Sequence, residues 1–196
     1  MTRAAKFVLA IFFISGCNNI PYTTIIPMIR SSIQGPESIN IDQEFVESRK
    51  FSFLKVKFGR RSEAILTLVS VENGVYKWIS SDDVRIYTLN GKITKLENFD
   101  TFNFESIYKN QPFHNNTGYY DLYLKTPRTF VSQSYSVITF HEKEKYFDKK
   151  IIEDIKTNGF KWNFKNQYFY LNNKPIKTEQ YIYPRAPKLI LEFYYK

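Results

Sequence analysis

The chain has 196 residues, a formal net charge of +9 at pH 7, 18% aromatic residues and one cysteine. This length suits one domain of ordinary size with a sizeable core, and a single cysteine excludes any disulfide within the chain. The basic excess favours an anionic partner such as nucleic acid, lipid headgroups or an acidic polymer. The many Tyr and Phe residues, with only 7 glycines, indicate a mainly β protein, because aromatic side chains suit half-buried pleated surfaces.

The N-terminus is typical of a secretory signal peptide. Arg3 and Lys6 precede an apolar run over residues 7–14, which is far shorter than the roughly 20 residues of a spanning helix. The run ends in Ile14-Ser15-Gly16-Cys17, the lipobox pattern of bacterial lipoproteins. Small residues let a peptidase approach the backbone, and the cysteine thiolate is a nucleophile that can accept a diacylglyceryl group. We expect a signal peptide over 1–16 and a lipid on Cys17; an ordinary cleaved signal peptide is the alternative.

Residues 17–40 are predicted to form the lipidated N-terminus and a tether, because Pro21, Pro27 and Pro36 interrupt any regular element. Asn18 follows the predicted lipidation site. In enterobacterial sorting an aspartate at that position retains a lipoprotein in the inner membrane, so Asn18 predicts the outer membrane, facing the periplasm. Export argues against nucleic acid as a partner. The scattered basic residues are read as solvated strand faces.

Residues 41–196 are predicted to form a single β domain. It begins with a short helix over 41–48, capped by Asn40 or Asp42. The apolar period then changes to two, and Asn73-Gly74 and Asn90-Gly91 mark hairpin turns. This pattern predicts an antiparallel meander with strands over 51–58, 64–71, 75–80, 84–89 and 92–96.

The second half of the chain is less regular. Residues 97–117 have no clear period, and residues 146–156 fit either a strand or a helix with Ile151, Ile152 and Ile155 on one face. Further strands are predicted over 119–125, 130–140, 160–162, 168–171, 176–182 and 189–194, which makes about ten in all.

The sequence contains no recognisable reaction centre. His114 and His141 lack partners at metal-ligand spacing, so we expect no metal and no other cofactor. Two carboxylate pairs could serve glycan hydrolysis, although both lie in charge-alternating stretches that we expect to be exposed: Glu142 with Glu144, and Glu153 with Asp154. We therefore assign no catalytic residues.

Two segments resemble the YjbF/GfcB lipoproteins, the group 4 capsule polysaccharide lipoprotein family. Tyr76-Lys-Trp78-Ile-Ser80-Ser-Asp82, continuing to Ile93, is similar to a block with the pattern Lys-Trp-aliphatic-Ser/Thr-x-Asp, a strand ending in Thr, a turn with Gly, and Arg-aliphatic. Ile176-Lys-Thr178-Glu-Gln180-Tyr181 is similar to the closing block of the family, and the lipobox is a third match. The chain departs from the family at Lys92, where Arg is usual, in the turn at Asn173-Lys174-Pro175, and over the weakly matching residues 97–160.

The physical roles of the matching residues are structural. Trp78 would fill a core position, Asn90 and Gly91 would fix the hairpin register, and Gln180 would satisfy buried backbone groups. Asp82 completes the motif. The resemblance also implies a large sheet curled into a half-barrel or open barrel, in agreement with the meander.

The resemblance implies a non-enzymatic outer-membrane lipoprotein that assists export or assembly of capsule or exopolysaccharide. Its expected partners are the membrane, through Cys17, an outer-membrane β-barrel and periplasmic export proteins, with a polysaccharide as a further candidate. Two alternatives remain open at this point: a periplasmic glycan-modifying enzyme, and a carrier that holds an acyl chain or a lipoprotein in an open-barrel cavity.

Overall fold

The computed structural model describes residues 38–196, apart from residues 61–62, 100–102, 109–111, 114, 126–127, 142–143, 145, 160–161 and 184–185. Residues 37–196 form one compact unit. The predicted signal peptide, Cys17, Asn18 and nearly all of the predicted tether lie outside the described residues, as do His114 and Glu142.

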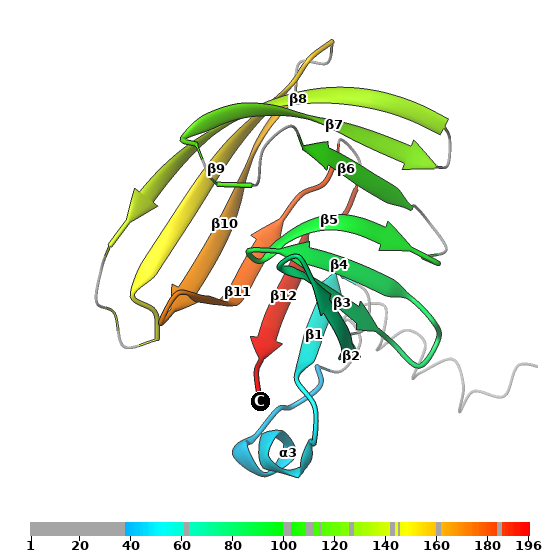
Figure 1. Cartoon of the computed structure of the whole chain (residues 1–196), viewed down its shortest axis with the longest axis vertical. Coiled ribbons are helices and arrows are strands. Elements are labelled where there is room, and N and C mark those ends of the chain that lie inside the picture. The colour runs from blue at the N-terminus through cyan, green and yellow to red at the C-terminus, as the bar shows by residue number, and fades with distance from the viewer. Residues whose placement is uncertain are drawn as a thin grey trace, which may run out of the picture. The chain divides into compact units, whose positions relative to one another are not determined.

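In the described part of the chain, one short helix precedes twelve strands (Figure 1). The helix α3 spans Gln43–Ser48. The first six strands are β1 (Phe53–Phe58), β2 (Glu63–Glu72), β3 (Val75–Ile79), β4 (Arg85–Leu89), β5 (Lys92–Glu97) and β6 (Phe104–Tyr108). The last six are β7 (Thr117–Lys125), β8 (Arg128–Phe140), β9 (Lys149–Thr157), β10 (Asn163–Leu171), β11 (Lys174–Gln180) and β12 (Leu189–Tyr194).

The sheet is an antiparallel meander that closes into a barrel. Every strand pairs with the next along the chain, and β1 pairs with β12 in a register that runs from Phe53 opposite Tyr194 to Phe58 opposite Leu189. The predicted mainly β meander is thereby confirmed. The expected half-barrel or open barrel is corrected to a closed one, because pairing the first strand with the last leaves neither as an unpaired edge.

The predicted short helix is present, and Asp42 is its cap. The Asp42 carboxylate accepts a hydrogen bond from the Phe45 backbone N–H at 2.8 Å, which satisfies one of the free donors of the first turn. The Phe45 ring meets the Phe53 ring edge-on, with 5.6 Å between centroids, and so joins the helix to β1. Within the described ranges, no helix is both long and apolar enough to cross a membrane.

The strand predictions differ from the structure in two places. β6 was not predicted, and the strand predicted over 168–171 is the end of the longer β10, which runs over Asn163–Leu171. The strand predicted over 160–162 lies outside the described residues except for residue 162, and the segment 146–156, left open between strand and helix, contains the strand β9. In β9 and β10 polar side chains point inward, so the apolar alternation that marks a strand is interrupted.

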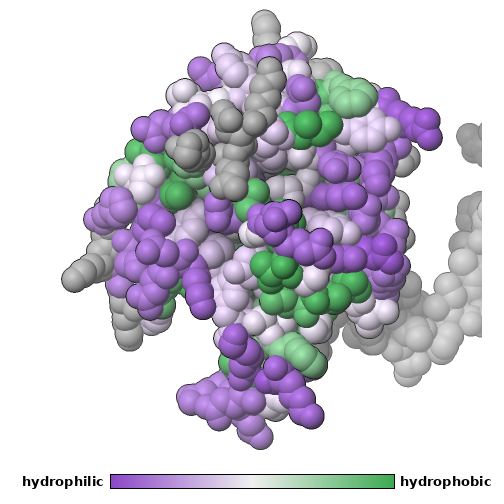
Figure 2. Space-filling view, in the orientation of Figure 1, coloured by the Kyte–Doolittle hydropathy of each residue, from purple (hydrophilic) through white to green (hydrophobic). Residues whose placement is uncertain are grey.

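The barrel interior changes character around the sheet. The largest buried cluster is mainly aliphatic, contains Trp78, and comes mostly from β1–β5 and β12. Two smaller clusters, from β7–β10, are rich in tyrosine. Outward-facing side chains are mostly polar, and Figure 2 shows hydrophilic residues over most of the visible face, with apolar residues in separate smaller patches.

Candidate functional site

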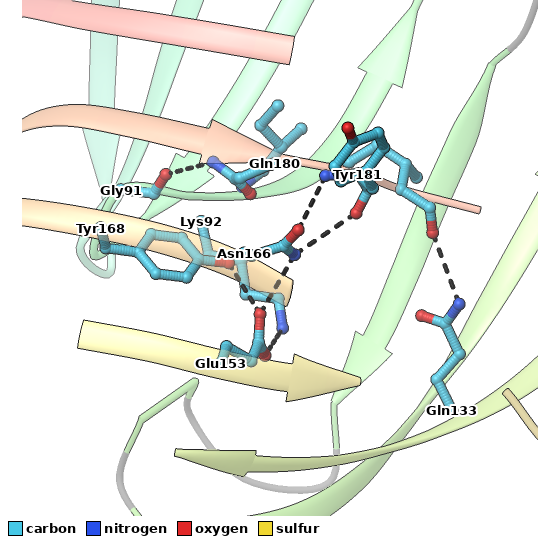
Figure 3. Close-up of polar contacts among 10 residues, drawn as sticks. Gly91, Lys92, Gln133, Glu153, Asn166, Tyr168, Gln180 and Tyr181 are labelled. Carbon is cyan, nitrogen blue, oxygen red and sulfur yellow. Dashed lines mark hydrogen bonds and ion pairs between the residues drawn. The ribbon is translucent and has the colours of Figure 1, made fainter. Parts of the chain in front are cut away.

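The two segments that carry the family resemblance meet inside the barrel at Gln180. Its side-chain Nε2 donates to the Gly91 carbonyl oxygen at 2.8 Å and to Thr178 Oγ1 at 2.8 Å. Its Oε1 accepts the Ile93 backbone N–H at 3.0 Å. Gln180 is buried, so its amide satisfies backbone groups that water cannot reach and ties β11 to the start of β5 (Figure 3).

The Asn90-Gly91 turn can lie close to β11 only because of its two residue types. Asn90 and Gly91 have φ values of +51° and +77°, as expected for a two-residue hairpin turn. A Cβ on Gly91 would lie 2.8 Å from the Cβ of Pro175, so only glycine allows the turn to lie this close to β11. On the neighbouring strand, the Tyr170 hydroxyl donates to the Asn90 carbonyl oxygen at 2.8 Å.

The other two motif residues lie elsewhere. Trp78 has none of its surface exposed, and its Nε1–H donates to Thr88 Oγ1 at 2.9 Å. Asp82 is exposed in the β3–β4 turn, at the opposite end of β4 from Asn90, beside a cavity of about 590 Å³. The structure therefore brings together Asn90, Gly91 and Gln180, and keeps Asp82 apart from them.

A buried ion pair follows the turn directly. Lys92 Nζ contacts Glu153 Oε1, and the two side chains are 4% and 1% exposed. The second Glu153 oxygen accepts the Tyr168 hydroxyl at 2.8 Å and the Asn166 amide at 3.3 Å (Figure 3). Because both carboxylate oxygens have donors, the charge of Glu153 is compensated in the dry interior.

Tyrosine rings surround the Lys92 ammonium group. Its Nζ lies 4.3 Å from the ring centroid of Tyr120, 5.2 Å from that of Tyr108 and 5.4 Å from that of Tyr135. Aromatic faces attract a desolvated cation by roughly 2 kcal/mol or more. Burial lowers the pKa of Lys92, and the adjacent Glu153 carboxylate opposes that shift.

The same surroundings keep the tyrosines neutral. Burial, and after it the negative charge of Glu153, raises the pKa of Tyr168 well above its ordinary value. Burial does the same for Tyr108 and Tyr120. The cluster is therefore a set of neutral hydroxyls around one internal ion pair.

The space beside this cluster is filled by side chains. The gap between Lys92, Tyr120, Asn166 and Gln180 has a volume of about 10 Å³. One water molecule needs roughly 10–15 Å³. This part of the interior therefore has no room for an acyl chain.

The candidate carboxylate pair Glu153–Asp154 is divided by strand alternation. Glu153 points into the barrel, whereas Asp154 points outward, with its Oδ2 3.9 Å from Lys165 Nζ. The expectation that Glu153 is exposed was wrong. Glu144 is exposed, and Glu142 lies outside the described residues.

His141 borders a cavity of about 470 Å³ at one end of the barrel. The cavity lies between the Asn90 turn and the adjacent ends of β8, β9 and β10, where Lys149 also borders it. Among the described residues, no group of three or more His, Cys, Asp or Glu could hold a metal ion.

The sequence did not predict the buried charges of Lys92 and Glu153. It also did not predict the cavity of about 470 Å³ beside the Asn90 turn, which we call the mouth cavity. One signal was present: Lys92 stands in the resemblance block, directly after the Asn-Gly turn, at a position where the family has a basic residue. Its partner Glu153 is 61 positions away and has no local signal.

The chain was compared with known proteins. The model of a family described as "Group 4 capsule polysaccharide lipoprotein gfcB, YjbF" matches residues 27–193. No curated protein matches the chain. The crystal structure of the hypothetical lipoprotein YmcC from Escherichia coli K12 is similar, with a TM-score of 0.62 and 14% sequence identity over 86% of this chain and 94% of that one. At this identity the similarity shows the fold alone.

Proposed function

The chain belongs to the group 4 capsule polysaccharide lipoprotein family, and from this premise we propose that it assists the export or assembly of a capsule or exopolysaccharide without catalysing a reaction. The observation that carries the proposal is the family match over residues 27–193. The placement of the motif residues supports it, because Gly91 and Gln180 hold two parts of the barrel together. Gly91 and Gln180 thus belong to the scaffold of the barrel, and a scaffold without a reaction centre suits a protein that binds partners.

The proposed location is the periplasmic face of the outer membrane. Cys17 would carry the diacylglyceryl group, and two acyl chains suffice for stable anchoring at about 0.8 kcal/mol per buried CH₂. Asn18 would permit release from the inner membrane. An outer-membrane β-barrel and periplasmic export proteins are the proposed partners, reached from the anchored position.

The two alternative functions have less support. A glycan-modifying enzyme of the paired-carboxylate type would need both groups in one cleft, and Glu153 and Asp154 lie on opposite faces of β9. A carrier would need room along its lumen, and the gap beside Lys92 has a volume of about 10 Å³, so an acyl chain would be confined to the cavity of about 590 Å³ beside Asp82.

The test is deletion of the gene in its native bacterium, with surface polysaccharide as the readout. We expect the deletion to reduce surface polysaccharide and the wild-type chain to restore it. Cys17→Ser, which removes the lipid attachment atom, and Asn18→Asp, which should retain the protein in the inner membrane, should each fail to restore it. Labelled palmitate and membrane fractionation verify both changes.

Two variants address the enzymatic alternative in the same strain. Glu144→Gln and Asp154→Asn should both restore surface polysaccharide, because neither residue is assigned a reaction. Unchanged polysaccharide in the deletion strain would contradict the proposed function. A correctly localised Glu144→Gln or Asp154→Asn protein that fails to restore export would favour the enzyme instead.

A further inference from the structure

The cavity at the barrel mouth has the size of a small-molecule site. Its volume of about 470 Å³ lies within the roughly 300–1,000 Å³ of such sites. Its walls come from the Asn90 turn, the loop at Phe113, and the adjacent ends of β8, β9 and β10, so segments far apart in the chain form it. The hydrogen bond from Tyr170 to Asn90 fixes two of these walls, which favours a preformed site.

Lys149 gives this cavity a positive charge with neutral partners. Its Nζ lies 4.4 Å from the ring centroid of Tyr170 and donates to Asn173 Oδ1 at 3.4 Å. No carboxylate of the described residues pairs with it, in contrast to Lys95 and Lys188 on the outer surface. The neighbouring Asp148 carboxylate is engaged by the Asn172 backbone N–H at 2.8 Å. The Lys149 ammonium group can therefore take an anion from solution.

The remaining lining divides into a polar rim and an apolar floor. Asn173, His141 and Thr139 are exposed polar residues at the rim. Ile151 and Tyr170 are buried beneath them. A pyranose ring has the complementary shape, because hydroxyl groups surround its edge while its C–H face is apolar and can rest on an aromatic or aliphatic floor.

From this combination we infer that the mouth cavity binds an acidic sugar residue, a pyranose whose carboxylate pairs with Lys149. The inference rests on the proposed function and deepens it, because it assigns a ligand class to one cavity. A carboxylate held by a single ammonium group supplies a charge-assisted hydrogen bond, and the amides and hydroxyls of the rim provide the orientation. The mouth cavity would hold a single acidic sugar unit of the polysaccharide, at the end of the barrel.

The experiment is calorimetric titration of the full-length protein in detergent. The probes are a tetrasaccharide that contains glucuronate, a neutral tetrasaccharide of equal length, and inorganic phosphate. We expect the acidic tetrasaccharide to bind at least tenfold more tightly than the neutral one. Lys149→Gln should weaken acidic binding by about tenfold or more, since it removes the charged donor of the hydrogen bond to the sugar carboxylate.

Lys150→Gln is the matched control for charge. It changes the same charge one position along β9, but the Lys150 side chain points outward, with its Nζ 5.3 Å from the Phe169 ring centroid. We expect no change in binding. Thr139→Trp should fill the cavity and abolish binding, whereas Ile138→Trp on the outer face should leave it intact, with thermal melts verifying that each variant is folded.

Four outcomes would overturn the inference. The first two are equal affinity for the acidic and the neutral tetrasaccharide, and displacement of the acidic tetrasaccharide by phosphate that binds equally tightly. The third is that Lys149→Gln and Lys150→Gln weaken binding equally. The fourth is that none of the probes binds. The last result would remove the sugar site and leave the proposed function standing, because the deletion phenotype is measured independently.

Discussion

Lys92 on β5 and Glu153 on β9 form an ion pair across the interior of the barrel, 61 positions apart in the chain. Two charges in a dry interior lose several kcal/mol of hydration each, and only close contact with further hydrogen bonds compensates that loss. The Tyr168 hydroxyl and the Asn166 amide supply those bonds at the second Glu153 oxygen. The pair is therefore sensitive to loss of one partner and tolerant of loss of both.

Glu153→Gln should destabilise the barrel by about 3–5 kcal/mol, because it leaves Lys92 as an unpaired buried charge. The double variant Lys92→Met, Glu153→Met should recover most of that loss. Lys165→Gln breaks the exposed pair with Asp154 and should cost at most about 1 kcal/mol. Chemical denaturation of the four proteins measures these differences, and equal stability of Glu153→Gln and Lys165→Gln would contradict a structural role for the pair.

The barrel should lose stability above pH 10. The pKa values of Tyr108, Tyr120 and Tyr168 are raised well above their ordinary value of 10.0, mainly by burial. Above pH 10 the unfolded chain releases phenolic protons that the folded barrel retains, which favours unfolding by about 1.4 kcal/mol per pH unit for each such tyrosine. The lowered pKa of Lys92 acts in the opposite direction, but only up to the ordinary value of 10.5.

Tyrosinate absorbance, followed together with circular dichroism, measures this alkaline transition. We expect part of the absorbance change to appear only as the fold is lost. Tyr120→Phe removes one phenolic proton, so the slope of stability against pH should become less steep by about one proton. Complete ionisation of the tyrosines in a folded barrel would show that these side chains are not buried.

Gly91→Ala should destabilise the protein more than Gly159→Ala. Both glycines have positive φ, +77° and +82°, so both substitutions carry a backbone cost of about 1–2 kcal/mol. At Gly91 the new Cβ would also lie 2.8 Å from Pro175 Cβ, whereas at Gly159 no atom of the described residues lies within 4 Å. Melting temperatures of the two variants separate the steric effect from the backbone effect, and equal values would show that the turn can move away from β11.

Trp78→Ala should cost about 3–5 kcal/mol of folding free energy, through lost burial and a residual cavity. Trp78 has 0% of its surface exposed, whereas Tyr119 is 68% exposed on the outer face. Tyr119→Ala should therefore change the melting temperature little. An unchanged melting temperature for Trp78→Ala would instead indicate that the tryptophan faces solvent, as a sugar-stacking residue would.

The fold was predictable where local signals are strong. Strands β2 to β5 follow from period-two alternation interrupted by Asn73-Gly74 and Asn90-Gly91, which are turn signals within a few residues of the strands they join. Closure between β1 and β12 has no such signal, because the pairing joins the two ends of the described barrel. Local turn signals therefore predict the pairing of successive strands but not the pairing of β1 with β12.

The interior site was hidden for a related reason. A charged residue in a strand is ordinarily assigned to the solvent face, and Glu153 was assigned there. In β9 and β10, Glu153 and Asn166 instead point inward, against the alternation of apolar inner and polar outer residues. The Asn166 amide donates a hydrogen bond to the Glu153 carboxylate, so each side chain satisfies the other in the interior. Such compensation is visible once both strands are placed side by side.

Closure through β1 and β12 also bears on how the chain acquires its structure. β1 has one neighbour in β2, within the first part of the barrel to be made, but its other neighbour is the final strand. The hydrogen bond from the Lys196 backbone N–H to Ser52 Oγ spans 144 positions. A chain that emerges N-terminus first therefore leaves one edge of β1 unpaired until β12 is available, and contacts so distant in sequence are slow to form. The interval before ring closure is thus when this protein is most exposed to mispairing with other chains.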